Sequence, residues 1–525
     1  MTTPHPHAAP PLLQMSGITK AFGPVLALDG VDFTVAPRQI HGLLGGNGAG
    51  KTTLMNVLYG LYSADAGTIT IDGVPVTIGS PRDAIAAGVG MVHQTFLQVD
   101  VFTVAENVVL GTSTAGVDVP ARLRELSERF GLAVDPTARV ADLPVGVRQR
   151  VEILKALYRG AKLLILDEPT TNLTPQEVDA LFGSMRAIVD EGMSVVLITH
   201  KIRETMAVCD QMTVMRDGRW VATLDAARTS ADDLAARMIG AAPLAVDAAG
   251  VPVPQSTGGR ARPTSRPGAV GAAPTDASAA RLVVRGLTVT AGADRAPLVA
   301  SVDIALAPGE ILGIAGVAGN GQVELAEALT GCRPVSGSLV LDGQELVGRP
   351  TATWLDAGVV YVPEDRQRDG ILPGADITEN LVLGSHRRLA RRGLLDWGRA
   401  RSDAARAIDE FSIKTPSAAT ACGRLSGGNI QRVILARAFG RDPSVLLLHN
   451  PTRGLDIAST AFVYDRVRRA AAAGCSVILI SEDLDEVLAL ADRVRVVYSG
   501  RLVGDVPRES ADPYALGRLM TGVGV

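Results

Sequence analysis

The stretch GGNGAGKTT at residues 45–53 is the feature that most restricts what this chain can fold into. It follows an apolar run, Ile40–Leu44, that is typical of a buried strand, and it precedes a helical pattern over Thr53–Tyr59. A glycine turn before an ordinary helix would not require Lys51 and Thr52 in that order. Glycines let backbone N–H groups face phosphate oxygens at a helix start, while the lysine adds charge and the threonine a hydroxyl for Mg²⁺. We therefore predict a P-loop for a nucleoside triphosphate such as ATP, formed by Gly45, Gly46, Asn47, Gly48, Ala49, Gly50, Lys51, Thr52 and Thr53.

Length and composition limit the remaining possibilities. A chain of 525 residues exceeds one ordinary core, so at least two domains are expected. Lysine and arginine number 51 against 55 acidic residues, and this net charge of −4 argues against a nucleic-acid partner. No apolar run approaches the roughly 18–20 residues that span a bilayer, so we expect a soluble protein that can dock on a membrane partner. The widely spaced cysteines predict neither a zinc site nor a disulfide framework: Cys209, Cys332, Cys422 and Cys475.

The chain repeats itself. Residues 12–240 and 281–525 carry similar landmarks, and the Pro-, Gly- and Ala-rich residues 241–280 between them predict a flexible linker. Residues 1–11 predict a disordered tail. Buried apolar strands such as Leu163–Leu166 and Val195–Ile198 indicate α/β units. The offset is 271 residues for the first of the following pairs and 282 for the other three: Gly45 and Gly316, Pro144 and Ser426, Asp167 and His449, His200 and Glu482.

Polar residues that follow the predicted strands of the first half point to hydrolysis. Asp167 and Glu168 end the run LLILDE, where Asp167 can help hold Mg²⁺ and Glu168 can polarise a water for attack on the γ-phosphate. His200 follows a second buried run and can contact the γ-phosphate. Gln94 can reach both Mg²⁺ and the attacking water, although by itself it would signify nothing. We therefore expect catalytic roles for Glu168, His200 and Gln94, and metal binding by Thr52, Gln94 and Asp167.

The second half contributes LSGGNIQR at residues 425–432. Ser426, Gly427 and Gly428 offer a hydroxyl and helix-start amides to an anion, although this stretch alone would indicate a simple N-cap. Taken in order, P-loop, glutamine, LSGG, Asp-Glu-Pro and histidine resemble the ATP-binding cassette family, over nearly the whole chain twice. The resemblance implies two tandem P-loop NTPase domains, each with a mixed-sheet core and a helical subdomain.

The same resemblance implies that the two cassettes pair with each other head to tail. The P-loop of the first half would then share its nucleotide with Ser426–Gly428 and with Asp456, which resembles the family's D-loop aspartate. Phe22 stands where the family places an aromatic residue against adenine, and no aromatic residue occurs in the matching stretch 287–299.

The departures from the family pattern fall on one site. Gln322 and Val323 replace the lysine and hydroxyl residue, while His449 and Asn450 replace the two carboxylates. Four other substitutions are Glu364 for glutamine, Glu482 for histidine, and Pro144 and Val145 for the first-half Ser-Gly. Glu364 and Glu482 would also repel a polyphosphate. We therefore predict one hydrolytic site and one that is slow or inert, and the sequence leaves open whether this second site still binds nucleotide.

Two fused cassettes without membrane spans resemble the ATPase subunits of bacterial importers for nucleosides and simple sugars. The implied partners are two membrane permease subunits and, through them, an extracellular solute-binding protein, and the implied place is the cytoplasmic face of the cell membrane. The stretches GVAGNGQVELAEALTG, VPEDRQRDG and TENLVLG resemble the nucleoside and simple-sugar branch. Within that branch, GVAGNGQ and the first-half stretch GVRQRVEILKAL favour nucleosides. A pentose or hexose importer and a non-transport regulatory ATPase stay as alternatives.

Overall fold

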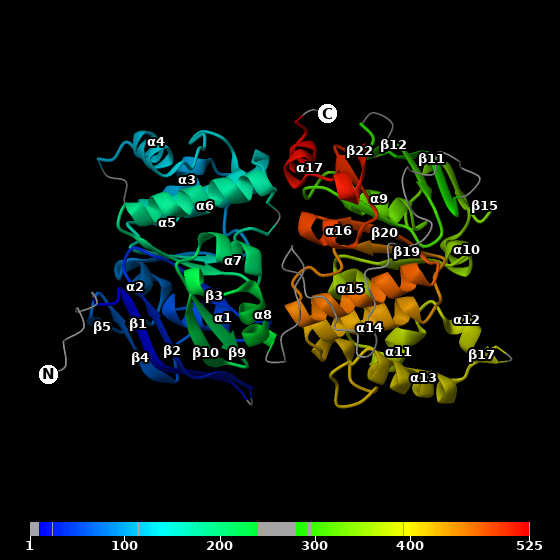
Figure 1. The fold of residues 1–525 in the computed structure, drawn as a ribbon, viewed down its shortest axis with the longest axis horizontal. Coiled ribbons are helices and arrows are strands. Elements are labelled where there is room, and N and C mark those ends of the chain that lie inside the picture. The colour runs from blue at the N-terminus through cyan, green and yellow to red at the C-terminus, as the bar shows by residue number, and fades with distance from the viewer. Residues whose placement is uncertain are drawn as a thin grey trace. The chain divides into compact units, whose positions relative to one another are not determined.

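The computed structural model describes residues 10–23, 25–112, 116–171, 173–239, 280–290, 296–391 and 393–523. The chain divides into two compact units, Met1–Gln255 and Ser256–Val525, which Figure 1 shows coloured along the chain. Most of the predicted tail (residues 1–9) and nearly all of the predicted linker (residues 241–279) lie outside the described residues. In the described part of the chain, no helix is long and apolar enough to cross a membrane.

The first unit contains two sheets. Its strands are β1 (Leu13–Phe22), β2 (Val25–Val35), β3 (Ile40–Leu44), β4 (Ala66–Ile71), β5 (Val74–Val76), β6 (Val89–Val92), β7 (Leu163–Asp167), β8 (Ser194–Ile198), β9 (Gln211–Arg216) and β10 (Arg219–Asp225). Six of them form a mixed sheet in the order β10-β9-β3-β8-β7-β6, in which only β10 runs antiparallel. The antiparallel sheet has the order β2-β1-β4-β5. Strands β3, β7 and β8 are buried along their whole length, as expected for strands covered on both faces.

The helices of the first unit cover the mixed sheet and build the helical subdomain. They are α1 (Lys51–Leu58), α2 (Pro81–Ala86), α3 (Val104–Val109), α4 (Val119–Phe130), α5 (Val145–Tyr158), α6 (Pro175–Asp190), α7 (Ile202–Val208) and α8 (Ala231–Ile239). Helices α3, α4 and α5 pack together around a separate apolar cluster that includes Val104, Leu123 and Val151. A capping box between Thr103 and Glu106 starts α3 by satisfying its first N–H groups.

The second unit repeats this architecture. Its strands are β11 (Leu282–Val289), β12 (Val299–Leu306), β13 (Ile311–Ala315), β14 (Ser336–Leu341), β15 (Gln344–Glu345), β16 (Val359–Val362), β17 (Ala390–Arg391), β18 (Leu394–Leu395), β19 (Val445–His449), β20 (Ser476–Ser481), β21 (Arg493–Tyr498) and β22 (Arg501–Pro507). The sheet order β16-β19-β20-β13-β21-β22 matches that of the first unit, with β22 again antiparallel. Its helices are α9 (Gln322–Ala328), α10 (Thr351–Asp356), α11 (Ile377–Val382), α12 (His386–Leu389), α13 (Trp397–Glu410), α14 (Gly427–Phe439), α15 (Ile457–Ala472), α16 (Leu484–Leu490) and α17 (Pro513–Met520).

These elements confirm the predicted α/β class, with a mixed-sheet core and a helical subdomain in each half. The two boundaries at the P-loop and the carboxylates differ slightly from expectation. Helix α1 begins at Lys51, two residues before the expected start, because Gly50 takes the left-handed N-cap position with φ +94°. Strand β7 includes Asp167, one residue beyond the expected end.

Candidate functional site

The order of the parallel strands gathers the predicted site residues of the first unit at one edge. Strands β3, β8, β7 and β6 are neighbours, so their carboxyl ends lie side by side. The P-loop follows β3, His200 follows β8, Glu168 follows β7 and Gln94 follows β6. The topology therefore brings together residues that are far apart in the sequence.

The P-loop conformation depends on glycines at two crowded positions. Gly45 has φ +154°, and a Cβ atom there would lie 2.3 Å from the carbonyl oxygen of Met215. Gly50 has φ +94°, and a Cβ atom there would lie 2.9 Å from the carbonyl oxygen of Ala27. Both contacts are with backbone, which cannot move aside as a flexible side chain could. A side chain at either position would therefore disrupt the loop.

Lys51 places its charge inside this loop. Its side chain is buried, and Nζ donates hydrogen bonds to the carbonyl oxygens of Gly45 (2.7 Å) and Gly46 (3.0 Å). These neutral partners hold the ammonium at the phosphate cradle without neutralising its charge. Lys51 is therefore positioned to exchange loop carbonyls for phosphate oxygens.

Thr52 and Asp167 form the predicted metal-binding pair. Burial and the neighbouring Glu168 raise the pKa of Asp167 to about 6, while Lys51 and a hydrogen bond with the Thr52 side chain act in the opposite direction. A hydroxyl and a carboxylate in contact fit Mg²⁺, which prefers oxygen ligands and takes only one or two from the protein when phosphate supplies others. Of the described residues, no three His, Cys, Asp or Glu side chains form a metal cluster.

Glu168 lies at the centre of the predicted catalytic residues. Gln94 Nε2 donates to Glu168 Oε2 at 3.1 Å, and His200 Nδ1 lies 3.0 Å from Glu168 Oε1. Burial acts to raise the pKa of Glu168, but the hydrogen bond with His200 and the charges of His200, Lys51 and Lys201 outweigh burial and lower it. The carboxylate is therefore ionised at neutral pH and able to accept a proton.

Phe22 lies on the surface and not in the core. Its ring is 42% exposed and meets Tyr62 edge-on, with ring centroids 5.1 Å apart. An exposed aromatic ring at the end of β1 is available to stack on a base. The contact with adenine stays a prediction.

The predicted anion-binding residues of the second unit lie at helix starts. Ser426 is the N-cap of α14, and its Oγ accepts a hydrogen bond from Asn429 Nδ2 at 2.9 Å, with Gly427 and Gly428 in the first turn. Asp456 is the N-cap of α15 and accepts from the Ser459 N–H at 2.7 Å. Their contribution to nucleotide binding stays a prediction.

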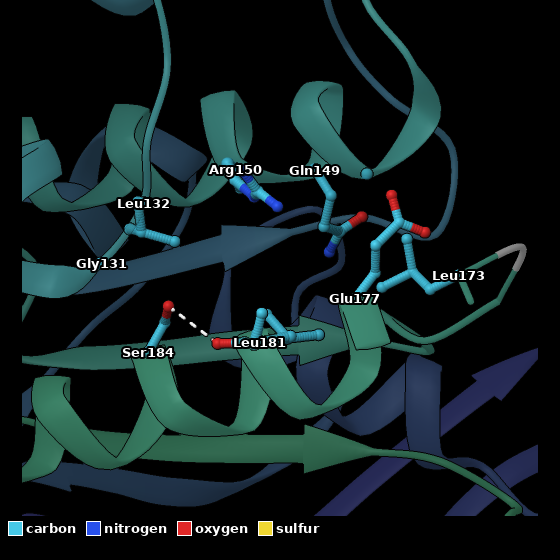
Figure 2. Close-up of a pocket in the computed structure, with 10 residues that line it drawn as sticks. Gly131, Leu132, Gln149, Arg150, Leu173, Glu177, Leu181 and Ser184 are labelled. Atoms are coloured by element: carbon cyan, nitrogen blue, oxygen red, sulfur yellow. Dashed lines mark hydrogen bonds between the residues drawn. The ribbon is translucent and has the colours of Figure 1, made fainter. Parts of the chain in front are cut away.

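The matching helix start of the first unit differs in its cap residue and in its packing against α6. Pro144 occupies the N-cap position of α5 and brings no hydroxyl. A Cβ atom on Gly146 would lie 2.3 Å from Glu177 Oε1, so α5 is in close contact with α6. Figure 2 shows the cavity between these helices, with Gln149 and Glu177 facing it. Its volume of about 10 Å³ has room for one water molecule and not for a nucleotide.

The second unit places Arg453 among the substituted residues, and sequence reasoning missed this arginine. Arg453 forms an ion pair with Glu364, and its Nη1 lies 3.9 Å from Glu482 Oε2. His449 Nε2 lies 3.6 Å from the same Glu364 carboxylate. The positive charge of Arg453 therefore offsets part of the repulsion that Glu364 and Glu482 are predicted to exert on a polyphosphate. The sequence does contain a signal for this arginine, because Arg453 occupies the position that matches Thr171 in the first half.

Comparisons with known proteins agree with this arrangement. A family model described as ABC transporter matches residues 28–171 and 299–453. The chain is 41% identical to a glucose import ATP-binding protein of Haloferax volcanii, over 98% of this chain and 96% of that protein. It is 40% identical to a guanosine import ATP-binding protein of Bacillus subtilis, over 97% of each chain. It is 37% identical to a nucleoside import ATP-binding protein of Lactococcus lactis, over 97% of this chain and 98% of that protein.

Proposed function

Because this chain belongs to the ABC transporter family and its relatives are import ATP-binding proteins with two cassettes, we propose that it hydrolyses ATP to energise nucleoside uptake. The observation that carries the hydrolytic part is the position of Glu168, held between Gln94 and His200 at the strand edge that bears the P-loop. We therefore assign the general base and the phosphate-binding lysine of the reaction to the first unit.

In this mechanism each residue has a defined task, and Gln94 has two. The P-loop amides and Lys51 bind the phosphates, and Glu168 takes a proton from the water that attacks the γ-phosphate. His200 and Gln94 hold the Glu168 carboxylate in place through the two hydrogen bonds described above. Thr52, Asp167 and Gln94 would hold Mg²⁺, which neutralises phosphate charge when bound.

The choice of nucleosides rests on sequence likeness. The stretches GVAGNGQ and GVRQRVEILKAL favour nucleosides, and two of the relatives above are guanosine and nucleoside import ATP-binding proteins. A sugar is the second candidate, because the relative with 41% identity imports glucose.

Uptake by living cells tests this choice. Cells that lack the gene would be complemented with the parent chain or with Glu168→Gln, and uptake of labelled nucleosides, pentoses and hexoses would be compared. We expect the variant to lose nucleoside uptake alone. Loss confined to a sugar would transfer the proposal to the second candidate, and unchanged uptake of all solutes would refute the importer role.

The partners of this proposal are two membrane permease subunits, which place the chain at the cytoplasmic face of the membrane. A cavity of about 270 Å³ in the first unit supports a docking surface for one of them. It lies beside β6, and its rim carries apolar side chains that are exposed: Leu61 at 46%, Leu97 at 61% and Leu110 at 45%. The lining also includes His93, Glu152, Lys155 and Arg159. A groove with an apolar rim and charged groups beside it fits one face of an amphipathic helix. We therefore assign this rim to a cytoplasmic helix of the permease.

Leu97→Glu is expected to separate hydrolysis from transport. A buried charge at this rim should weaken docking by about tenfold or more, whereas ATPase activity of the purified chain should stay within about twofold, because Leu97 touches no catalytic group. Uptake and phosphate release would be measured in parallel. Val74→Glu is the matched control, since Val74 is 61% exposed on β5, away from the cavity. Equal uptake by parent and Leu97→Glu would rule out this surface.

A further inference from the structure

The second unit keeps the shape of a P-loop without its chemistry. The segment GVAGNGQV, residues 316–323, joins β13 to α9, and Gly321 takes the left-handed N-cap position with φ +95°, as Gly50 does in the first unit. The backbone that would cradle a phosphate is therefore present. The side chains that lie inside the loop are different.

The side chain of Gln322 occupies the loop from within. It is only 4% exposed, its Oε1 accepts the Asn320 N–H at 2.9 Å, and its Nε2 donates to the Val317 carbonyl oxygen at 2.6 Å. A Cβ atom on Gly316 would lie 2.9 Å from the same Nε2, so the amide rests against the first glycine of the loop. The amide oxygen of Gln322 thus accepts the Asn320 N–H, a donor that an anion would otherwise need.

Lys51 occupies the matching position of the first unit in a different way. It donates to the Gly46 carbonyl, the counterpart of Val317, but it carries a charge that a phosphate can attract. A neutral amide gains no such attraction, so removal of Gln322 from its two hydrogen bonds has no compensating ion pair. The loop of the second unit is therefore stable as it stands.

Asn320 further fixes this conformation. Its Nδ2 donates to the Val317 carbonyl at 2.9 Å, and its Oδ1 accepts from the Ser499 N–H at 2.9 Å. The first unit has Ala49 at this position, whose methyl group can form neither bond. Two side-chain amides thus cross-link a loop that is held by backbone and Lys51 in the first unit.

The metal and γ-phosphate positions are altered as well. Val323 is 44% exposed in place of the Thr52 hydroxyl, and burial lowers the pKa of His449, which replaces Asp167. An alkyl group and a neutral imidazole do not offer Mg²⁺ the oxygen ligands that it prefers. Where Glu168, Gln94 and His200 meet in the first unit, Arg453 is engaged by Glu364 and lies near Glu482.

We propose that the P-loop-like segment of the second unit, residues 316–323, binds no nucleotide at any stage, so that one chain binds one ATP. The side chains of Gln322 and Asn320 close the phosphate cradle, and the residues at the metal position do not fit Mg²⁺. The proposal rests on ATP binding by the first unit and does not depend on the transported solute.

Equilibrium dialysis of the full chain with labelled ATP and Mg²⁺ tests it. We expect one ATP per parent chain and none on Lys51→Ala under the same conditions. If Lys51→Ala still binds about one ATP per chain, the proposal is overturned. Failure of the importer role would appear instead as unchanged uptake, with this stoichiometry unaffected.

Two further measurements guard against a poorly folded Lys51→Ala chain and test the cause. The parent chain would be photolabelled with 8-azido-ATP and cleaved within residues 241–280, and the label should appear only on the N-terminal fragment. In the Lys51→Ala background, the combined changes Gln322→Lys, Asn320→Ala and Val323→Thr should restore measurable binding. Label on the C-terminal fragment, or no restored binding, would contradict the role given to Gln322 and Asn320.

Discussion

Replacing Glu168 by glutamine is expected to lower kcat for ATP hydrolysis by about 10²–10⁴-fold, the usual cost of losing a general base. Glutamine has nearly the same size and can still bond to His200, but it cannot take a proton from water. ATP should remain bound, because the P-loop and Lys51 are unchanged. Phosphate release would give the turnover, and retention of labelled ATP on the chain would give the binding.

Glu191→Gln is the matched control for this substitution. Glu191 pairs with Arg129 at the surface, and both side chains are more than 40% exposed. Its loss should leave turnover unchanged, since solvent and salt screen a pair at the surface. A Glu168→Gln chain that hydrolyses ATP at the parental rate would show that the general base is another group.

Replacing Lys51 by alanine is expected to weaken ATP binding by at least about 10–150-fold, which corresponds to the roughly 1.5–3 kcal/mol of one hydrogen bond to a charged group. The change removes the ammonium from the cradle and leaves the Gly45 and Gly46 carbonyls facing the nucleotide. ATP binding by the P-loop and ATP turnover should fall together. Fluorescent ATP analogues would give the dissociation constants.

Lys162→Ala provides the control for the loss of a lysine. The Lys162 side chain is 63% exposed and pairs with Asp72 at the surface. Its removal should leave ATP affinity and turnover at parental values. If Lys51→Ala binds ATP as tightly as Lys162→Ala does, Lys51 of the P-loop does not bind phosphate.

Much of the fold could be predicted from the sequence because its strands are short apolar runs with polar residues at their ends. Leu163–Leu166 and Val195–Ile198 are in fact the interiors of β7 and β8. The hairpin of β17 and β18 could not be predicted, since strands of two residues leave no periodic pattern. The capping box of α11, formed by Asp376 and Glu379, is a signal that the sequence did contain.

The site was predictable as a set of residues and not as a set of contacts. Motif spacing identified Gln94, Glu168 and His200, but their approach within hydrogen-bond distance depends on the strand order β8-β7-β6. The backbone of Glu168 also has φ +48°, a conformation that costs a non-glycine residue of order 1 kcal/mol and that no motif reveals.

In the second unit, sequence reasoning found the substitutions but not the arginine that faces them. Glu364 and Glu482 were expected to repel a polyphosphate. Arg453 instead pairs with Glu364, and burial raises the pKa of Glu482 to about 7, so its charge is partly lost near neutral pH. Such internal balance depends on which side chains face one another, and residue identity alone does not determine this.

One ATP per chain, as proposed from the filled loop at Gln322, would limit how steep a solute gradient the transporter could sustain. The highest attainable ratio of inside to outside concentration grows exponentially with the free energy delivered per solute moved, at about 1.4 kcal/mol for each factor of ten. A pump that hydrolyses one ATP per solute moved reaches a concentration ratio whose logarithm is half that of a pump that hydrolyses two. A transporter energised by one such chain would reach a smaller concentration ratio but use less ATP per solute moved. This suits a cell that consumes scavenged solutes at once.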